Sequence, residues 1–269
     1  MRRAVDGSSV LKIYRGVHPP ARRDRESYAL ERARRWGLRT PTVLATGEWP
    51  GHAWSVLSTV PGEPCAVTTP RGLQDYVNRV LAVIANIHGH HSTAPGPGWR
   101  SDQGTTTPAH REFLLSQLST RCSSQSWWSD LRAALAPLDD LPTVHLHGDI
   151  KPEHLLVAGE EVHVLDWEAS ARGPAACDYA DVVFHLVRDL VYGGQVPQHL
   201  PADIVGSVPV DGPVLAWRTV LWLDRRRPDD IGAMSRRGLV SLADERIPTH
   251  TVQTLARLIA GLRAVGVPR

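Results

Sequence analysis

The pattern of apolar and polar positions changes near residue 60 of this 269-residue chain. Before that point the apolar runs are short and end in turn residues, which is typical of strands. Asp6-Gly7 is a strong hairpin signal, because glycine tolerates a positive φ. A highly charged segment at 22–36 has a helical pattern, and Gly37 ends it. The predicted strands are residues 2–4, 9–14, 41–47 and 53–60.

After Pro61-Gly62 the pattern becomes that of long helices joined by loops. Residues 73–88 carry apolar side chains at helical spacing, and residues 92–108, rich in Gly, Pro, Ser and Thr, are predicted as a loop. The runs HLHGDIKPEHLLV and VHVLDWE indicate a loop and a hairpin. Further helices are predicted at residues 110–121, 126–137, 176–192, 214–224 and 252–265. We therefore predict an N-terminal lobe at 1–60 and a helical C-terminal lobe at 61–269.

The composition argues against several classes of protein. With 42% hydrophobic residues the chain can bury a core, and a net charge of +2 is too small to predict a nucleic-acid surface. No apolar stretch reaches the roughly 18 residues expected of a membrane-spanning helix. The three cysteines lack metal-site spacing, and the basic N-terminus has no apolar segment after it. We therefore expect a cytoplasmic protein with free thiols and with neither a nucleic acid nor a membrane as a partner.

Lysine occurs at two places only, although the chain has 30 Lys and Arg residues. Lys12 lies in the apolar run VLKIY, and Lys151 lies two residues after Asp149 in the segment HGDIKPEH. Where arginine is so strongly favoured, a remaining lysine marks a place where a compact ammonium does what a planar guanidinium does not. A lysine on a strand and a second lysine beside an aspartate together indicate a phosphoryl-transfer enzyme.

The segment HGDIKPEH at 147–154, followed by VLDWE at 164–168, resembles the active-site core of the aminoglycoside phosphotransferase and choline kinase family. The resemblance extends to VLKIY, RESYAL, WSVLSTVPGEP and ARGPAACDYADVV, and so covers most of the chain. It implies an α+β, bilobal protein-kinase-like fold, with a small, truncated β-rich N-terminal lobe and a larger, mainly helical C-terminal lobe. It also implies ATP as the phosphate donor and Mg²⁺ as the metal, with Mn²⁺ as an alternative.

The resemblance assigns chemistry to two aspartates. Asp149 would accept a hydrogen bond from the substrate hydroxyl and orient it toward the γ-phosphate. Asp166, which follows the strand-like VHVL, would bind Mg²⁺ through a carboxylate oxygen, the donor that this ion prefers. Asp178 matches the aspartate that braces the catalytic loop, and His147 is expected to pack and to shape that loop.

The basic residues would hold the phosphates. Lys12 would contact the α- and β-phosphates, while Glu26 on the following helix holds its ammonium. Glu26 fits the family's spacing before Gly37 better than Glu31 does, although it also fits one of the many solvated charges on that helix. Lys151 corresponds to the lysine that faces the transferred phosphate in Ser/Thr protein kinases.

The adenine would lie at the hinge between the lobes. Backbone groups of Ser58, Thr59 and Val60 would meet its edge, although these three residues also fit a plain strand end. Trp167 would either cover the nucleotide or fill the lobe interface.

The sequence departs from the family at two points. The family has an asparagine for the second metal where this chain has His154, and imidazole is a poor ligand for Mg²⁺. Either one metal is sufficient, or His154 binds there in a different way. In addition, only eleven residues precede Lys12, so we expect the first strand and the glycine-rich loop to be missing. One explanation is that the chain starts downstream of the true start. Another is that the glycine-rich loop, which covers the phosphates, is absent, so that ATP binds weakly or a partner protein completes the nucleotide site.

Three functions remain open from the sequence. The first is an ATP-dependent phosphotransferase that acts on a hydroxyl of a small molecule, an antibiotic or a metabolite. The second is a Ser/Thr kinase for a precursor peptide in modified-peptide biosynthesis, working with a lyase partner. The third is a non-catalytic pseudokinase scaffold, against which the joint presence of both lysines and both aspartates argues. A cationic aminoglycoside would need an acidic pocket, for which the candidates are Asp181, Asp189, Asp224, Asp229 and Asp230.

Overall fold

The chain forms two compact units in a computed structural model. The first unit comprises residues 1–106 and 144–172, and the second comprises residues 107–143 and 173–269. The lobe boundary predicted after Val60 lies inside the first unit and stays a prediction. Within these units the structure describes residues 2–90, 96–99, 107–192, 200–233, 239, 241–242 and 248–264. In this part of the chain no helix has the length and apolar character needed to cross a membrane.

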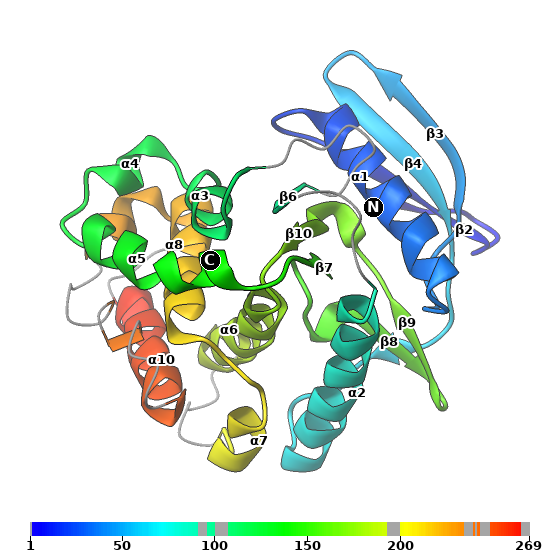
Figure 1. The fold of residues 1–269 in the computed structure, drawn as a ribbon. Helices are drawn as coiled ribbons and strands as arrows, with labels where there is room; N and C mark the ends of the chain where they lie inside the picture. The colour runs from blue at the N-terminus through cyan, green and yellow to red at the C-terminus, as the bar shows by residue number, and fades with distance from the viewer. Residues whose placement is uncertain are drawn as a thin grey trace. The chain divides into compact units, whose positions relative to one another are not determined.

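A four-stranded antiparallel sheet begins the first unit (Figure 1). Its strands are β1 (Arg2–Arg3), β2 (Ser9–Tyr14), β3 (Val43–Trp49) and β4 (His52–Ser58), in the order β1-β2-β4-β3. Gly7 turns the β1–β2 hairpin with a φ of 71°, which glycine adopts without steric penalty. The predicted strands and hairpin are therefore confirmed, and Lys12 is paired with Ser55 across β2 and β4.

Helix α1 (Pro19–Arg35) starts earlier than predicted, because two prolines occupy its first turn. Proline suits this position, since its fixed φ is helical and its missing N–H has no helical partner to lose. Gly37 follows the helix with a φ of 79°, as expected of a residue that ends it. The buried residues of α1 recur at helical spacing and are Glu26, Ala29, Leu30 and Ala33. The buried face of α1 thus carries one carboxylate among small and apolar side chains.

Two three-stranded sheets contain the strands that come before and after the HGD segment in the sequence. One consists of β5 (Glu63–Pro64), β8 (Leu155–Ala158) and β9 (Glu161–Val164), and the other of β6 (Gly98–Trp99), β10 (Ala171–Gly173) and β7 (Val144–Leu146). The β8–β9 pair is the predicted hairpin. Helix α2 (Pro70–His88) buries the predicted apolar face, and the Thr69 hydroxyl caps its start by accepting a hydrogen bond from the Gly72 N–H. The predicted loop at 92–108 lies mostly outside the described residues.

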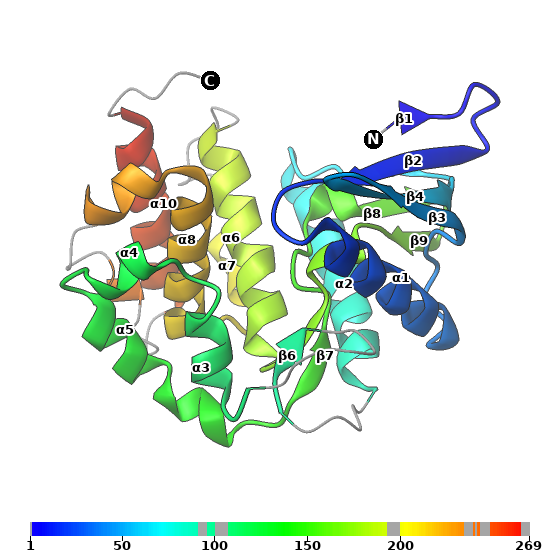
Figure 2. The same cartoon turned by 90° about the horizontal axis from the view of Figure 1, so that it is seen from above.

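The described part of the second unit is helical (Figure 2). The helices are α3 (His110–Leu115), α4 (Thr120–Ser123), α5 (Trp128–Ala134), α6 (Ala176–Tyr192), α7 (Ala202–Gly206), α8 (Gly212–Arg226) and α10 (Pro248–Ala264). Helices α6, α8 and α10 pack against one another. The helix predicted at 110–121 is two helices, because Asp224 accepts hydrogen bonds from the N–H and the hydroxyl of Ser119, both at 2.6 Å, and a new helix starts there.

Candidate active site

A cavity of about 430 Å³ in the first unit collects most of the predicted site residues. Eight of the nine line it, namely Lys12, Glu26, Ser58, Thr59, Val60, Lys151, His154 and Asp166. Asp149, the ninth, is bound to two of these residues, because its carboxylate lies 3.1 Å from Lys151 Nζ and its carbonyl oxygen lies 2.8 Å from His154 Nδ1. Segments far apart in the sequence therefore meet at one place.

Lys12 is the centre of the charged cluster. Strand β2 turns its side chain inward, where the residue is 6% exposed. Its Nζ lies 2.7 Å from Glu26 Oε2, 2.5 Å from Asp166 Oδ1 and 3.3 Å from Glu168 Oε2. Burial disfavours the ammonium, but the three carboxylates, led by Glu26, raise the pKa of Lys12 above its usual value. Lys12 is therefore a buried cation at neutral pH.

Glu26 anchors this lysine from helix α1. The residue is 1% exposed, and its Oε2 also accepts a hydrogen bond of 2.5 Å from the Tyr14 hydroxyl. Burial raises the pKa of Glu26, and the charge of Lys12 opposes that rise. Glu31, the other candidate from the sequence, is exposed and pairs with Arg35. The structure thus brings Glu26, and not Glu31, to the lysine.

Asp166 joins the lysine to the HGD loop. It follows β9 with a φ of 58°, a left-handed conformation that is strained for a residue with a side chain. Its Oδ1 accepts from Lys12, and its Oδ2 lies 3.2 Å from His154 Nε2. Burial opposes ionisation, but the hydrogen bond to His154 and the charge of Lys12 hold the pKa of Asp166 well below its usual range. The side chain is therefore a carboxylate with both oxygens engaged.

The loop that carries Asp149 is fixed by backbone contacts. Gly148 has a φ of 82°, and a Cβ at this position would lie 2.2 Å from the Ala169 carbonyl oxygen, so only glycine fits. The fully buried His147 donates from Nε2 to the Leu165 carbonyl at 2.9 Å, as a carbonyl can only accept. The expectation that His147 packs and shapes the loop is confirmed.

His154 connects two loops through its two ring nitrogens. Nδ1 donates to the carbonyl of Asp149, and Nε2 faces the carboxylate of Asp166. The ring is 7% exposed. In this arrangement both nitrogens contact oxygen atoms of the protein, which is the geometry of a brace between loops.

Glu168 is a member of the cluster that the sequence analysis missed. Besides contacting Lys12, its carboxylate pairs with Arg22, and its carbonyl accepts from Arg25 at 3.2 Å. Oxygens of Glu26, Asp166 and Glu168 lie within 4.8 Å of one another, close enough to share a metal ion. The available signal was its place in the VLDWE motif, two residues after Asp166.

At the end of β4, two backbone N–H groups already donate hydrogen bonds within the protein. The Ser58 N–H donates to the Thr42 carbonyl at 2.8 Å, and the Thr59 N–H donates to the Ser8 carbonyl at 3.1 Å. These two N–H groups are therefore already bonded within the protein.

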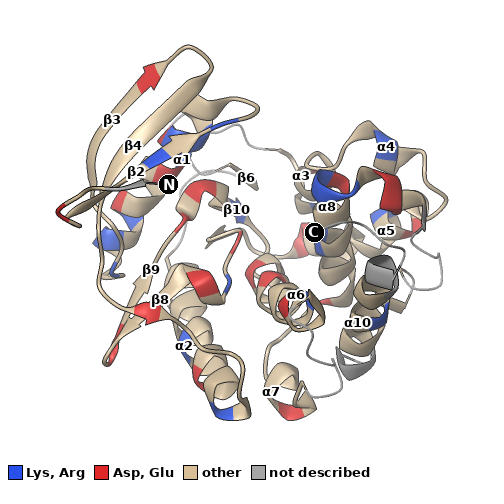
Figure 3. Ribbon diagram, turned by 180° about the vertical axis from the view of Figure 1, so that it is seen from behind, with Lys and Arg blue, Asp and Glu red and all other residues tan. Residues whose placement is uncertain are grey.

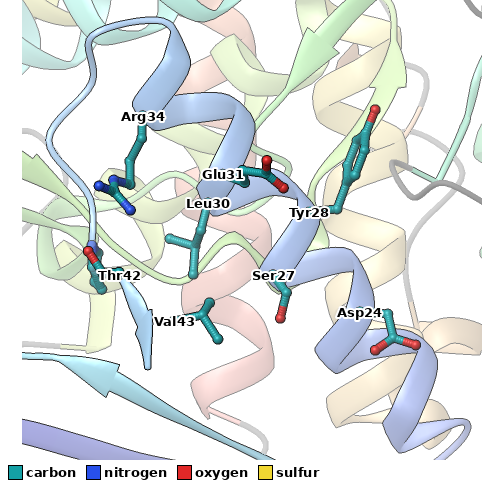
Figure 4. Close-up of a pocket in the computed structure, with 9 residues that line it drawn as sticks. Asp24, Ser27, Tyr28, Leu30, Glu31, Arg34, Thr42 and Val43 are labelled. Carbon is teal, nitrogen blue, oxygen red and sulfur yellow. The ribbon is translucent and has the colours of Figure 1, made fainter. Parts of the chain in front are cut away.

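A second cavity of about 470 Å³ lies between α1 and the start of β3 (Figure 4). Figure 4 places Ser27, Leu30 and Arg34 of α1 around it, opposite Thr42 and Val43. None of the nine predicted site residues lines this cavity. Of these two cavities, the one lined by Lys12 and Asp166 therefore holds the candidate chemistry.

Comparison with known proteins agrees with this geometry. Residues 2–197 match the model of APH, a phosphotransferase enzyme family. No curated protein sequence matches the chain significantly.

Solved structures show the fold. A mutant of aminoglycoside phosphotransferase APH(4)-Ia in complex with ADP and hygromycin B aligns with a TM-score of 0.60 at 15% identity, over 89% of this chain and 88% of that chain. The GDP complex of a mutant aminoglycoside 2′-phosphotransferase-IIIa has a TM-score of 0.56 at 14% identity, over 88% and 85%. A choline/ethanolamine kinase family protein from Mesorhizobium loti has a TM-score of 0.51 at 18% identity, over 93% and 87%.

The fold expected from the sequence, α+β and protein-kinase-like, is confirmed by these structures. At such identities they establish the fold alone. The family is established independently, because its model matches well over half of the chain. The chain belongs to the APH phosphotransferase enzyme family.

Proposed function

We propose that this protein is an ATP-dependent phosphotransferase that moves the γ-phosphate of ATP to a hydroxyl group of a small molecule. The observation that carries the proposal is the gathering of Lys12, Asp166 and Lys151 at one cavity of about 430 Å³. Phosphoryl transfer depends on positioning and on charge stabilisation, and this set of residues supplies both. Membership of a phosphotransferase family supports the reaction type.

The nucleotide would occupy the same cavity. Apolar side chains of Val10, Leu57 and Leu156 line it and would contact the adenine. Backbone groups of Ser58, Thr59 and Val60 would meet the edge of the base, as predicted from the sequence, although the N–H groups of Ser58 and Thr59 already donate within the protein. Two of the similar solved structures contain ADP or GDP, which supports a nucleotide ligand.

A divalent metal fits the carboxylates of Asp166 and Glu168. Mg²⁺ prefers such oxygen donors, and the low pKa of Asp166 keeps this ligand ionised. We assign Mg²⁺, with Mn²⁺ as an alternative, to these two residues, where it would neutralise charge on the phosphates. His154 would contribute as the brace between loops, since both of its ring nitrogens are already engaged with oxygen atoms.

Asp149 would bind the substrate hydroxyl. Its side chain is part-exposed and its carboxylate lies 3.1 Å from Lys151 Nζ. The carboxylate would accept a hydrogen bond from the hydroxyl and orient it for in-line attack. Lys151 would restrain that carboxylate and place a positive charge where the phosphoryl group passes.

The candidate acidic residues of the second unit weigh against a polycationic acceptor. Acidic positions recur along α6 (Figure 3), but most of the candidates already have partners. Asp181 binds Arg218, Asp189 binds Arg188, Asp224 binds Ser119, and Asp230 lies 3.8 Å from Arg227. Asp181, Asp189 and Asp230 each face a guanidinium, and a carboxylate paired in this way attracts an amine only weakly. We therefore favour a metabolite that carries hydroxyl groups without several amines.

Labelled ATP tests this proposal directly. The protein would be incubated with γ-labelled ATP, Mg²⁺ and three acceptor panels: neutral polyols and sugars, aminoglycosides, and Ser/Thr peptides. We expect label on a neutral acceptor, and we expect Asp149→Ala to abolish transfer while nucleotide affinity changes by less than about threefold. Transfer to peptides alone would support the peptide-kinase alternative. Tight ATP binding with no transfer to any panel, in Mg²⁺ or Mn²⁺, would instead indicate a scaffold.

A further inference from the structure

We propose that Lys12 is the resident cation of the Asp166–Glu168 carboxylate pair, and that a divalent metal enters only when nucleotide phosphates draw the ammonium away. The proposal rests on the proposed function for the identity of the metal. It adds an order of events to that function.

The charges around Lys12 are the first step of the argument. One ammonium contacts three carboxylates, those of Glu26, Asp166 and Glu168, at 2.7, 2.5 and 3.3 Å. Its side chain is 8% exposed, so water contributes little to its solvation. Such a cluster is stable only while a cation remains in it, because buried carboxylates repel one another strongly in a medium of low dielectric constant.

The engagement of Asp166 is the second step. Lys12 holds its Oδ1, and His154 faces its Oδ2. A metal ion needs a lone pair of this carboxylate, and Oδ1 already accepts a hydrogen bond from the ammonium. A metal and Lys12 therefore compete for Asp166, and among the described residues the other carboxylates in contact with the ammonium are those of Glu26 and Glu168.

The cavity supplies the third step. Lys12 lines it together with Asp166, so phosphates bound there would offer the ammonium a new partner. The lysine stem is flexible, and Glu26 can retain the ammonium on its other side during the change. Nucleotide and metal should therefore strengthen each other's binding by the same factor, since coupling between two ligands is reciprocal.

Mn²⁺ binding without nucleotide tests the exchange. Free Mn²⁺ would be measured by electron paramagnetic resonance during titration of the full chain and of Lys12→Met. We expect weak binding to the unmodified protein and binding at least about tenfold tighter to the variant. Addition of ADP should tighten Mn²⁺ binding to the unmodified protein about tenfold or more, but should change binding to Lys12→Met by less than about threefold.

The other lysine of the chain provides a matched control. Lys151→Met removes a cation that lines the same cavity but pairs with Asp149 instead of Asp166. Its Mn²⁺ affinity without nucleotide should stay within about twofold of the unmodified protein. If Lys12→Met does not fold, Lys12→Met with Glu26→Gln removes the buried, uncompensated acid and permits the same titration.

Two results would overturn the proposal. One is a Lys12→Met variant with unchanged Mn²⁺ affinity, and the other is equally tight Mn²⁺ binding by the unmodified protein with and without ADP. The proposed function fails in a different experiment, the transfer assay. A protein that shows the exchange of Lys12 and Mn²⁺ but no transfer would retain this inference and lose the proposed reaction.

Discussion

Each unit of the molecule buries a charged cluster, and the two clusters differ in their balance of charge. In the first unit one ammonium, Lys12, meets three carboxylates beside a cavity of about 430 Å³. In the second unit the guanidinium of Arg218 binds the Asp181 carboxylate, and its Nη2 lies 3.0 Å from His185 Nε2. Its Cζ lies 4.6 Å from the centre of the Phe184 ring, so the pair is also packed against an apolar surface.

The comparison shows what distinguishes a candidate site from a structural ion pair. Burial alone does not, because Asp181 and Arg218 are 2% and 8% exposed, about as buried as Lys12. The first cluster has an excess of one sign, and Asp166 within it has a strained, left-handed backbone, whereas Asp181 and Arg218 lie within regular helices. Strain and charge imbalance are costs that a fold retains where a ligand relieves them.

The largest expected effect is on the rate of phosphoryl transfer, and it concerns Asp166 of the first cluster. Asp166→Asn keeps the shape of the side chain, and asparagine tolerates the left-handed backbone. We expect the rate of phosphoryl transfer to fall by about a thousandfold or more, because the proposed metal ligand is lost. The free energy of unfolding should fall by about 1–3 kcal/mol without unfolding the protein, because the ionised carboxylate accepts from Lys12 and faces His154.

Both quantities come from one preparation, by a transfer assay and by urea denaturation. A variant with normal transfer would remove Asp166 from the proposed site. A variant that unfolds instead would place Asp166 with the structural ion pairs of the second unit.

The second prediction concerns the Asp181–Arg218 pair of the second unit. Arg218→Met should lower the free energy of unfolding by about 3–5 kcal/mol, because it leaves the Asp181 carboxylate buried without its cation. Arg218→Met combined with Asp181→Leu should recover much of that loss, since both charges are then absent. Urea denaturation of the two variants measures the difference. Equal stability of the single and double variants would show that the pair carries no electrostatic coupling.

Much of the candidate site follows from the sequence, because its residues belong to short motifs. The two lysines, HGD and VLDWE identify Lys12, Asp149, Lys151 and Asp166 without any structure. The family's spacing before Gly37 adds Glu26, which the structure then places on the buried face of α1. The predicted strands and the β8–β9 hairpin also agree with the structure, since alternation and turn residues are local signals.

The remaining features depend on contacts that no local pattern encodes. Glu168 reaches Lys12 because Asp166 adopts a left-handed turn, and neither strand nor helix periodicity predicts that direction. The two hydrogen bonds of His154 depend on the relative position of two loops. The break between α3 and α4 is due to Asp224, a residue more than a hundred positions along the chain from Ser119. Side chains that act at such separations require the folded structure.

A glycine pair tests how firmly the catalytic loop is fixed. Gly148→Ala adds a Cβ that would lie 2.2 Å from the Ala169 carbonyl oxygen, in a backbone with a φ of 82°. We expect about 1–2 kcal/mol of lost stability from the left-handed backbone and about 1–3 kcal/mol more from the clash. Gly159→Ala is the matched control, because its φ is 62° and no atom lies within 4 Å of the added Cβ.

Thermal denaturation and the transfer assay distinguish the two glycines. Gly159→Ala should lose only the stability that an alanine in a left-handed backbone costs, and it should retain its transfer rate. Gly148→Ala should also lose transfer, because relief of the clash displaces the adjacent Asp149. Equal effects of the two substitutions would indicate that the loop yields to the extra methyl group without consequence.

The smallest expected effect concerns His154, the brace within the first cluster. His154→Asn restores the residue type of the family, and a shorter amide can retain one of the two contacts with oxygen atoms. We expect Mg²⁺-dependent transfer to stay within about threefold of the unmodified protein or to improve, because oxygen is a better donor to Mg²⁺ than imidazole. His154→Ala removes both contacts and should reduce the rate by about tenfold through a less ordered Asp166. Rates at saturating ATP in Mg²⁺ and in Mn²⁺ measure both variants. Loss of Mg²⁺ activity in His154→Asn with retention in Mn²⁺ would mean that the imidazole acts on the metal itself and not as a brace.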